Sequence, residues 1–313
     1  MRCATPLNRR ADTTRLPTTL TTVCLLVFAW QTESEYPLVV AANRDERLDR
    51  PARSLVVLRP SRPRVLGGLD EIAGGTWLAV NERGVVAGLT NRPAPGGRDL
   101  TKRSRGELPL MVAEQRSADE GVSQLLATVR GGDYNPAWLL IGDRQVLYYV
   151  ELAADQPPTV HQLAPGVHVL ENVALGDASV KADRIRSLVS SARSGQGDLW
   201  AALPGVLADH TLPEATAGSP AEAEAPVGAD SAPGGAVDAA PGRAVDTSPG
   251  GAVGTAPRRE ATLAACVHTD DYGTRSAALV RVPEDPTERP EMQVADGPPC
   301  TSPFVDVGSS WTD

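Results

Sequence analysis

Apolar runs along the first part of the chain predict paired strands. Residues 24–31 and 37–43 are continuous apolar stretches joined by a short polar turn, as expected for two buried strands. Residues 76–81 and 85–91 form a hairpin candidate, and Gly84 suits its turn because glycine readily adopts a positive φ. The polar residues 44–50, directly after the second strand, are interpreted as a charged loop.

Helical and alternating segments follow one another through the rest of the chain. Ser104 precedes a helical pattern, and further helices are predicted over 119–129, 179–191 and 198–208. Further strands are predicted over 136–142, 145–152, 166–173, 263–269, 276–282 and 291–295. Short sequential hairpins make antiparallel sheets, so we expect an α/β (α+β) fold: a four-layer αββα sandwich of two sheets with helices outside.

An abrupt change of composition divides this domain. Residues 211–257 are nearly all Ala, Pro, Gly, Glu, Asp and Ser, and a Pro-Gly-x-Ala-Val motif recurs there every eight residues. A repeat of that length buries too little apolar surface to form a solenoid, so we expect a disordered insert. Residues 1–23 are interpreted as a disordered leader or a mis-called start, 24–300 as a single domain, and 301–313 as a flexible tail.

Composition and charge restrict the function. The formal net charge is −9 and no block of Lys or Arg occurs, which argues against nucleic-acid binding. No apolar stretch reaches 18 residues, so no membrane span is expected. No strand is followed by GxGxxG and no GxxxxGK[ST] occurs, which excludes dinucleotide and P-loop binding.

The cysteines favour a reducing compartment. Four are present, far apart and without a CxxC pair: Cys3, Cys24, Cys266 and Cys300. This pattern indicates neither a disulfide framework nor a zinc motif, so we predict a cytoplasmic protein without cofactor or metal. A secretory signal is disfavoured because the apolar run 23–30 is short and has no small-x-small cleavage site.

Polar residues stand at the ends of several predicted strands, where side chains can converge. Taken alone, Cys24 is most simply a buried apolar side chain, and each polar residue is most simply part of a solvated turn. The candidate catalytic residues are Cys24, Arg44, Asn91, Asn172 and Arg275, with Asn43, Asp45 and Glu46 in support. Together these groups suit acyl transfer, because a nearby Arg lowers a thiol pKa and Asn amides stabilise an oxyanion.

A general base for this chemistry is not evident. None of the four histidines stands out as the partner of Cys24, although a Cys-His dyad stays open. An α-amino group, with an ordinary pKa of about 7.7–8.0, would serve if Cys24 were the first residue of the chain.

Several motifs at compatible spacing resemble the NRDE family, which is transport-and-Golgi-organisation-2-like. They are Cys24-Leu25-Leu26-Val27-Phe28, Ala41-Ala42-Asn43-Arg44-Asp45-Glu46, Arg50-Pro51, Gly74-Gly75-Thr76-Trp77-Leu78, Leu89-Thr90-Asn91, Arg105-Gly106-Glu107-Leu108 and Tyr272-Gly273-Thr274-Arg275. The resemblance runs from Cys24 to about Ala295, and in that family the Cys normally follows the initiator Met. The family in turn resembles N-terminal-nucleophile hydrolases such as the choloylglycine hydrolases.

That resemblance implies roles for individual residues. Cys24 would be the nucleophile with its own amine as base, and Arg44 would hold the thiolate or the substrate. Asn91 and Asn172 would contact the oxyanion and the amine, and Arg275 would brace the site. Asp45 would bind the α-amine.

The expected function is therefore that of an amidohydrolase or acyltransferase on a small amide or thioester. The alternative is a non-catalytic carrier or chaperone of a small molecule such as haem or lipid. The chain departs from the family in its leader, its insert and Glu171. Either a true start at Val23, whose codon can initiate translation when it is GTG, or autocleavage after Val23 would free the amine of Cys24. Neither the substrate nor the oligomeric state follows from the sequence.

Overall fold

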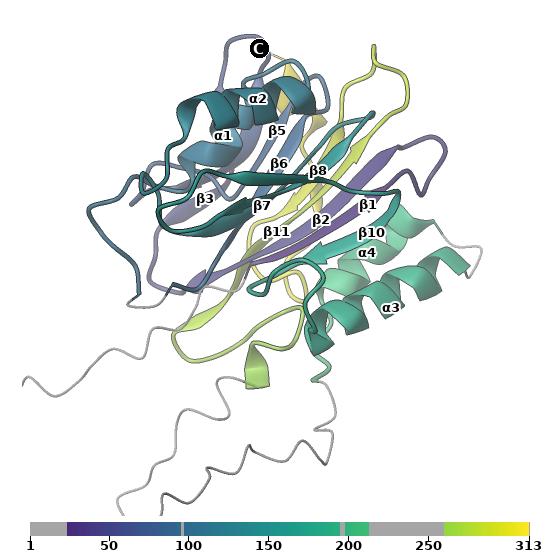
Figure 1. Ribbon diagram of the computed structural model, residues 1–313. Coiled ribbons are helices and arrows are strands. Elements are labelled where there is room, and N and C mark those ends of the chain that lie inside the picture. Colours follow the sequence, from purple (N-terminus) through teal and green to yellow (C-terminus); the bar gives the residue numbers. More distant parts are fainter. Residues whose placement is uncertain (1–23, 95–96, 195–197, 213–259, 313) are drawn as a thin grey trace, which may run out of the picture.

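Two stacked antiparallel sheets, each covered by helices on its outer face, make up the folded part of the chain (Figure 1). The computed structural model describes residues 24–94, 97–194, 198–212 and 260–312. The predicted four-layer αββα sandwich is confirmed. The expectations for residues 1–23 and for 213–257 within the insert lie outside the described residues.

The first sheet is formed by strands from both ends of the chain. Its order is β10-β1-β2-β11-β12-β13. The strands are β1 (Leu25–Trp30), β2 (Leu38–Arg47), β10 (Gly166–Leu170), β11 (Tyr272–Val282), β12 (Glu291–Ala295) and β13 (Val305–Asp306). The central strand β2 pairs with β1 on one side and with β11 on the other, so residues far apart in sequence become neighbours.

The second sheet follows the order of the chain. It runs β3-β4-β5-β6-β7-β8-β9 as a meander. The strands are β3 (Ala52–Arg59), β4 (Val65–Asp70), β5 (Leu78–Asn81), β6 (Val86–Asn91), β7 (Ala137–Gly142), β8 (Leu147–Leu152) and β9 (Thr159–Gln162). The predicted hairpins at β5–β6 and β7–β8 are both present.

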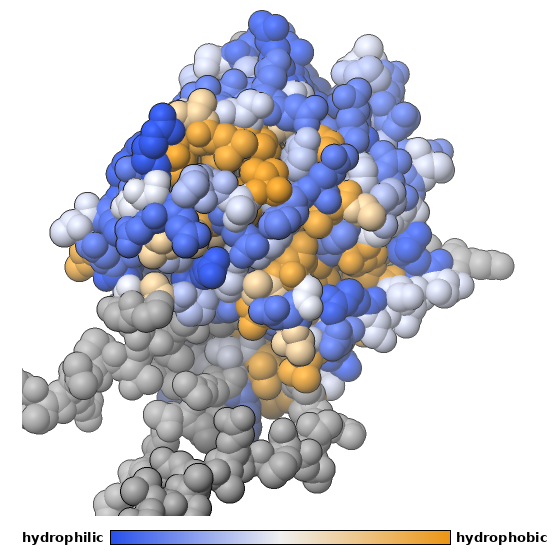
Figure 2. Space-filling view, viewed as in Figure 1, coloured by the Kyte–Doolittle hydropathy of each residue, from blue (hydrophilic) through white to orange (hydrophobic). Residues whose placement is uncertain are grey.

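Helices bury the outer face of each sheet. α1 (Glu107–Ala113) and α2 (Ala118–Thr128) pack on the second sheet, and α3 (Val180–Ser194) and α4 (Leu199–Leu207) pack on the first. The largest apolar cluster lies between the sheets, with Phe28 at its centre fully buried. On the side shown in Figure 1, hydrophobic residues gather in the middle of the surface and hydrophilic ones lie around them (Figure 2). No helix in the described ranges is long and apolar enough to span a bilayer.

The structure corrects several expectations. Residues 44–47 are not loop but the continuation of β2, because β11 supplies hydrogen-bond partners that the local polar pattern does not reveal. β3, β4 and β9 were missed, and two of them are edge strands, where polar side chains are tolerated. Residues 263–269 form no strand apart from a single bridge at His268. Residues 301–312, expected to be a flexible tail, contain β13 and a 3₁₀ helix (Gly308–Trp311) that buries Trp311 in the core.

Two glycines hold the loop before β5 against the start of α1. Thr76 N donates to Gly106 O, and a Cβ on Gly75 would lie 2.6 Å from the backbone of Gly106. A Cβ on Gly106 would in turn lie 2.7 Å from Thr76 N. This close backbone contact explains why glycine occurs in both motifs, and it positions Arg105.

We expect Gly106→Ala to destabilise the fold by about 1–3 kcal/mol, because backbone atoms would have to move apart. The matched control is Gly205→Ala in α4, where the added Cβ meets nothing within 4 Å. That change should stabilise the helix by about 0.5–1 kcal/mol. Urea unfolding of both variants measures the difference, and equal stability of the two would contradict this account.

Candidate active site

The pairing of β1 places Cys24 between two predicted site residues. Leu25 pairs with Asn43 of β2, and Leu26 pairs with Leu170 of β10. Extending these registers beyond the ends of the strands puts Cys24 opposite Arg44 on one side and opposite Asn172 on the other. Leu26 and Ala42 point into the core between the sheets, so the alternation of strand residues aims Cys24 and Arg44 toward the second sheet.

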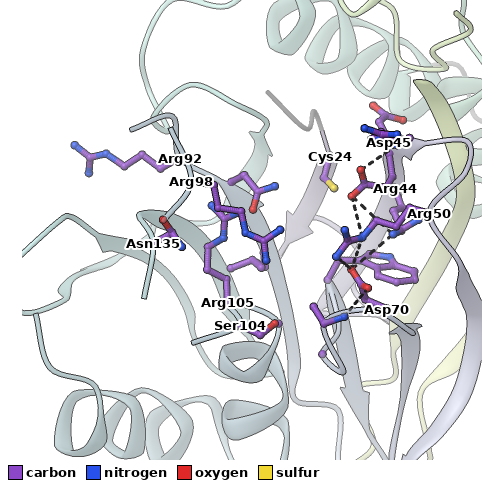
Figure 3. A pocket seen from close by; sticks show the side chains of 18 of the residues that line it. Cys24, Arg44, Asp45, Arg50, Asp70, Arg92, Arg98, Ser104, Arg105 and Asn135 are labelled. Atoms are coloured by element: carbon purple, nitrogen blue, oxygen red, sulfur yellow. Dashed lines mark hydrogen bonds and ion pairs between the residues drawn. The ribbon is translucent and has the colours of Figure 1, made fainter. Parts of the chain in front are cut away.

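Cys24 lies in the wall of a cavity of about 600 Å³. Other predicted residues that line it are Arg44, Asp45, Glu46 and Asn91, and the lining also includes Arg50, Asp70, Trp77, Arg92, Arg98, Ser104, Arg105 and Asn135. Figure 3 shows the Cys24 sulfur between two groups, with Arg98 and Arg105 on one side and Arg44, Arg50 and Asp70 on the other. A small molecule in this cavity would therefore contact the thiol and several cations.

The Cys24 thiol is not activated by its surroundings alone. Burial raises its pKa to about 12, and the nearby Asp45 adds to this, although Arg44 and the backbone N–H of Asp45 act in the opposite direction. Arg44 does act to lower the thiol pKa, as expected, but desolvation of the sulfur outweighs the guanidinium and the net pKa is raised. A thiolate at this position needs a base that takes the proton during the reaction.

Arg44 is held beside the cavity by an aromatic ring and two acids. Its guanidinium lies 4.5 Å from the centroid of Trp77, and its Nη2 lies 3.9 Å from a carboxylate oxygen of both Glu46 and Asp70. The side chain is 4% exposed, and among the described residues its buried Nη1 has no hydrogen-bond partner. A buried cationic N–H without a partner is costly, so this atom is a ready donor to a bound anion.

Asp70 belongs to the same wall. Arg50 Nε donates to Asp70 Oδ2 at 2.9 Å, and Arg50 Nη2 lies 2.8 Å from the same oxygen in an ion pair. Burial opposes ionisation of Asp70, but the backbone N–H of Ala73 and Arg50 outweigh it and lower the pKa of the carboxyl. The Asp70 carboxylate thus keeps Arg50 and Arg44 in place.

The four residues of the Asn-Arg-Asp-Glu motif divide between the two faces of β2. Arg44 and Glu46 lie on the cavity side, where Glu46 Oε2 is 3.6 Å from Arg50 Nε. Asn43 lies on the helix side, and its amide donates to Leu207 O at 2.9 Å and Ala265 O at 2.8 Å. Arg44 and Glu46 therefore form part of the cavity wall, whereas Asn43 hydrogen-bonds the backbone of the segments packed on the other face of β2.

Asp45 also lines the cavity, but its buried carboxylate has its partners on the helix side of β2. Thr274 donates to Asp45 Oδ1 at 2.6 Å, and Lys181 Nζ lies 3.8 Å from Oδ2. Burial raises the pKa of Asp45 to about 6, while Lys181 and Thr274 act to lower it. The Asp45 carboxylate thus has partners of its own behind β2.

Two of the predicted catalytic residues do not line the cavity, and neither does the supporting residue Asn43. Arg275 is the bulged residue between Thr274 and Ser276 of β11, and its guanidinium donates to Leu48 O at the surface. A bulge re-aims the side chain that it carries, and the sequence does not reveal it. Asn172 follows β10 across from Cys24 but is also absent from the cavity wall.

Arg98 and Arg105, which lie across the cavity from Arg44, were not predicted as site residues. Burial, with a contribution from Arg98, lowers the pKa of Arg105 to about 10. Asn135 bonds both the N–H and the C=O of Asp99, which anchors the segment that carries Arg98. Within the described ranges neither Arg98 nor Arg105 forms an ion pair with an acidic side chain. The only available signal was the Arg105-Gly106-Glu107-Leu108 motif, which the sequence analysis quoted without giving it a role.

Comparison with known proteins identifies relatives of the chain. A family model described as "Transport and Golgi organisation 2" matches residues 23–288. The Transport and Golgi organization protein 2 homolog of Bos taurus is 33% identical over 166 residues, covering 49% of this chain and 58% of the relative. The Homo sapiens homolog is 32% identical over 167 residues, with the same coverage. The chain therefore spans 58% of the length of these curated relatives.

Solved structures that resemble the chain are more distant. The Caenorhabditis elegans N-acylethanolamine-hydrolyzing acid amidase ortholog matches with a TM-score of 0.42 and 14% identity, covering 62% of this chain and 88% of that one. Penicillin V acylase from Agrobacterium tumefaciens matches with a TM-score of 0.33 and 13% identity, covering 55% and 57%.

Proposed function

Because the chain belongs to the Transport and Golgi organisation 2 family, we propose that the cavity lined by Cys24 and Arg44 is an acyl-transfer site in which Cys24 attacks a small anionic amide or thioester. The observation that carries this proposal is the position of the Cys24 thiol in a cavity wall beside Arg44, whose buried Nη1 has no partner among the described residues. A nucleophile next to an unoccupied cationic donor is the arrangement that a tetrahedral oxyanion needs.

The base in this mechanism is the α-amine of Cys24, as the first residue of the active chain. The raised thiol pKa keeps the resting sulfur neutral, so the amine takes the proton as the sulfur attacks the carbonyl carbon. The oxyanion accepts hydrogen bonds from Arg44, with the amide of Asn91, which lines the same cavity, as a second donor. The protonated amine then gives its proton to the leaving group, and water or a second acceptor releases the acyl group from the sulfur.

The arginines support an anionic substrate. Arg98 and Arg105 face the thiol without an acidic side chain paired to either in the described ranges, and Arg98 disfavours the charge of Arg105. A carboxylate or phosphate placed between them would relieve this repulsion and form charge-assisted hydrogen bonds. The substrate class that fits is an acyl compound with a negative group a short distance from its carbonyl.

Two acyl probes that differ only in a terminal carboxylate test the proposal. We expect both to label Cys24 in a chain that begins at this residue, and the anionic probe to label it at least about tenfold faster, since a charged hydrogen bond contributes about 1.5–3 kcal/mol. Peptide mapping by mass spectrometry locates the label. Cys24→Ala should remove it, Arg105→Met should remove the preference, and Arg53→Met, which changes an exposed guanidinium outside the cavity lining, should alter neither.

A non-catalytic carrier is the second candidate, and the raised pKa of the Cys24 thiol favours it. In that case the cavity would bind an anionic small molecule through the same arginines without forming a covalent bond. Saturable binding of the anionic probe without any acylation of a chain that begins at Cys24 would establish the carrier and exclude the enzyme. In either case we propose a cytoplasmic protein, supported by the three free cysteines of the described ranges.

A further inference from the structure

Two cysteines and two histidines meet at the surface, behind the sheet that carries Cys24. The potential ligand atoms of His210, Cys266, His268 and Cys300 all lie within 4.8 Å of one another. They come from three segments: the end of the α4 region, the segment before β11 and the turn after β12. Cys266 is buried and the other three are exposed, so a metal ion can reach the cluster from solvent.

The distances between these atoms match a tetrahedral zinc site. The two Sγ atoms are 3.7 Å apart, and His268 Nε2 lies 3.5 Å from Cys266 Sγ and 3.3 Å from Cys300 Sγ. Bonds of about 2.3 Å to sulfur and 2.0–2.1 Å to nitrogen give a tetrahedron with S···S edges of about 3.8 Å and S···N edges of about 3.5 Å. An ion at the centre would therefore require little movement of the side chains.

His210 completes the set of ligands in the correct tautomer. Its Nδ1 lies 3.1 Å from Cys266 O, and its ring centroid is 5.0 Å from that of His268. An Nδ1–H that donates to a backbone carbonyl leaves Nε2 unprotonated and free to bind a metal, which is the usual support for a histidine ligand. Two thiolates and two imidazoles form a closed set that prefers zinc and leaves no position for a substrate.

We propose that His210, Cys266, His268 and Cys300 bind one structural Zn²⁺ ion. The ion closes the chain across residues 211–265 and ties both ends of that segment to Cys300. Two of the three joined segments also contact β2, the strand that contains Asn43 and Asp45. Asn43 bonds Leu207 O and Ala265 O, and Val267 N donates to Thr274, which in turn donates to Asp45. Zinc thus stabilises the layer against which β2 is held.

A disulfide between Cys266 and Cys300 is the rival interpretation of the same pair. Both cysteines are free, and their 3.7 Å separation suits two ligands of one ion. A disulfide would also leave His210 and His268 without a role. Because the two interpretations require opposite oxidation states, one preparation under reducing conditions separates them.

The test is zinc content and affinity of the untagged full chain, purified with reductant and loaded with Zn²⁺ before exhaustive dialysis. We expect one zinc per chain by plasma mass spectrometry. Cys300→Ser should weaken zinc binding by more than roughly 10–100-fold, which is the typical effect of changing a residue that only orients a metal ligand. Replacing zinc with Co²⁺ should produce the visible absorption of a tetrahedral thiolate site in the wild type and not in Cys300→Ser.

Matched controls keep the test independent of folding and of the proposed activity. Cys24→Ser and the exposed His161→Ala change the same residue types elsewhere and should retain one zinc per chain. A chelator should lower the melting temperature of the wild type and leave that of Cys300→Ser unchanged. Substoichiometric zinc in the reduced and folded wild type, or full zinc retention by Cys300→Ser, would overturn the proposal.

Discussion

A chain that begins at Cys24 is expected to turn over an anionic amide or thioester about 10²–10⁴-fold faster than the same chain with Val23 retained, which is the usual contribution of a general base. The reason is the burial of the Cys24 sulfur, which raises the thiol pKa to about 12 and leaves little thiolate at neutral pH. A free α-amine next to the sulfur can take the proton, whereas an amide nitrogen cannot. Steady-state kinetics of the two chains, each released from a fusion by a protease, measures the ratio.

Two controls make this comparison decisive. Both chains should melt at the same temperature, because the extension adds only one residue before β1. Cys24→Ala in the shorter chain should reduce turnover to background. Equal turnover by the two chains would remove the α-amine from the mechanism and return attention to a side-chain base. The intact mass of the protein from its native host would show independently where the mature chain begins.

Replacing Arg44 by Met is expected to lower kcat/KM by about 10²–10³-fold, the loss typical of removing one oxyanion donor. Methionine keeps much of the packing against Trp77 but removes the buried Nη1 donor. The fold should survive, because Arg50 continues to neutralise Asp70 through a hydrogen bond and an ion pair. Kinetics and thermal melting on the same preparation separate loss of chemistry from loss of structure.

Arg53→Met is the matched control for this prediction. Arg53 lies on β3 outside the cavity lining, is 60% exposed, and is paired with the exposed Glu71. Surface ion pairs contribute little, so turnover should change by no more than a few-fold. Arg44→Lys should recover only part of the rate, because an ammonium lacks the planar fork of donors that a guanidinium offers. A loss of the same size in Arg53→Met and Arg44→Met would contradict a specific role for Arg44.

Local pattern was sufficient for most of the core elements. The continuous apolar runs of β1 and β2, the alternating hairpins β5–β6 and β7–β8, and the periodic helices α2 to α4 were all predictable, because each buries one face or both against the sandwich core. The motifs with paired glycines were recognisable as well. Only the structure explains Gly75 and Gly106, since the contact between their backbones joins residues 31 positions apart (106 − 75).

The candidate site divides in the same way. The sequence analysis expected Cys24, Arg44, Asn91, Asn172 and Arg275 to converge, with Asn43, Asp45 and Glu46 in support. The cavity is lined by Cys24, Arg44, Asp45, Glu46 and Asn91, and not by Asn43, Asn172 or Arg275. The sequence could not show that Arg44 lies on a different face from Asn43 and Asp45, because the residues after Asn43 resembled a loop. Only the pairing with β11 makes them part of a strand, in which successive side chains point to opposite faces. The bulge that directs Arg275 to the surface and the loop that brings Arg98 to the cavity depend likewise on contacts with distant segments.

The sequence by itself determined the two-sheet architecture, the family and the cysteine at the start of β1, because these depend on hydrophobic periodicity and on short motifs. Only the tertiary structure decided that the pKa of that cysteine is raised and that Arg98 and Arg105 line the same cavity. It also decided that His210, Cys266, His268 and Cys300 lie together. The physical reason is common to all three. Burial, charge pairing and metal geometry depend on distances between residues that are far apart in the chain, and those distances exist only after the two sheets have packed.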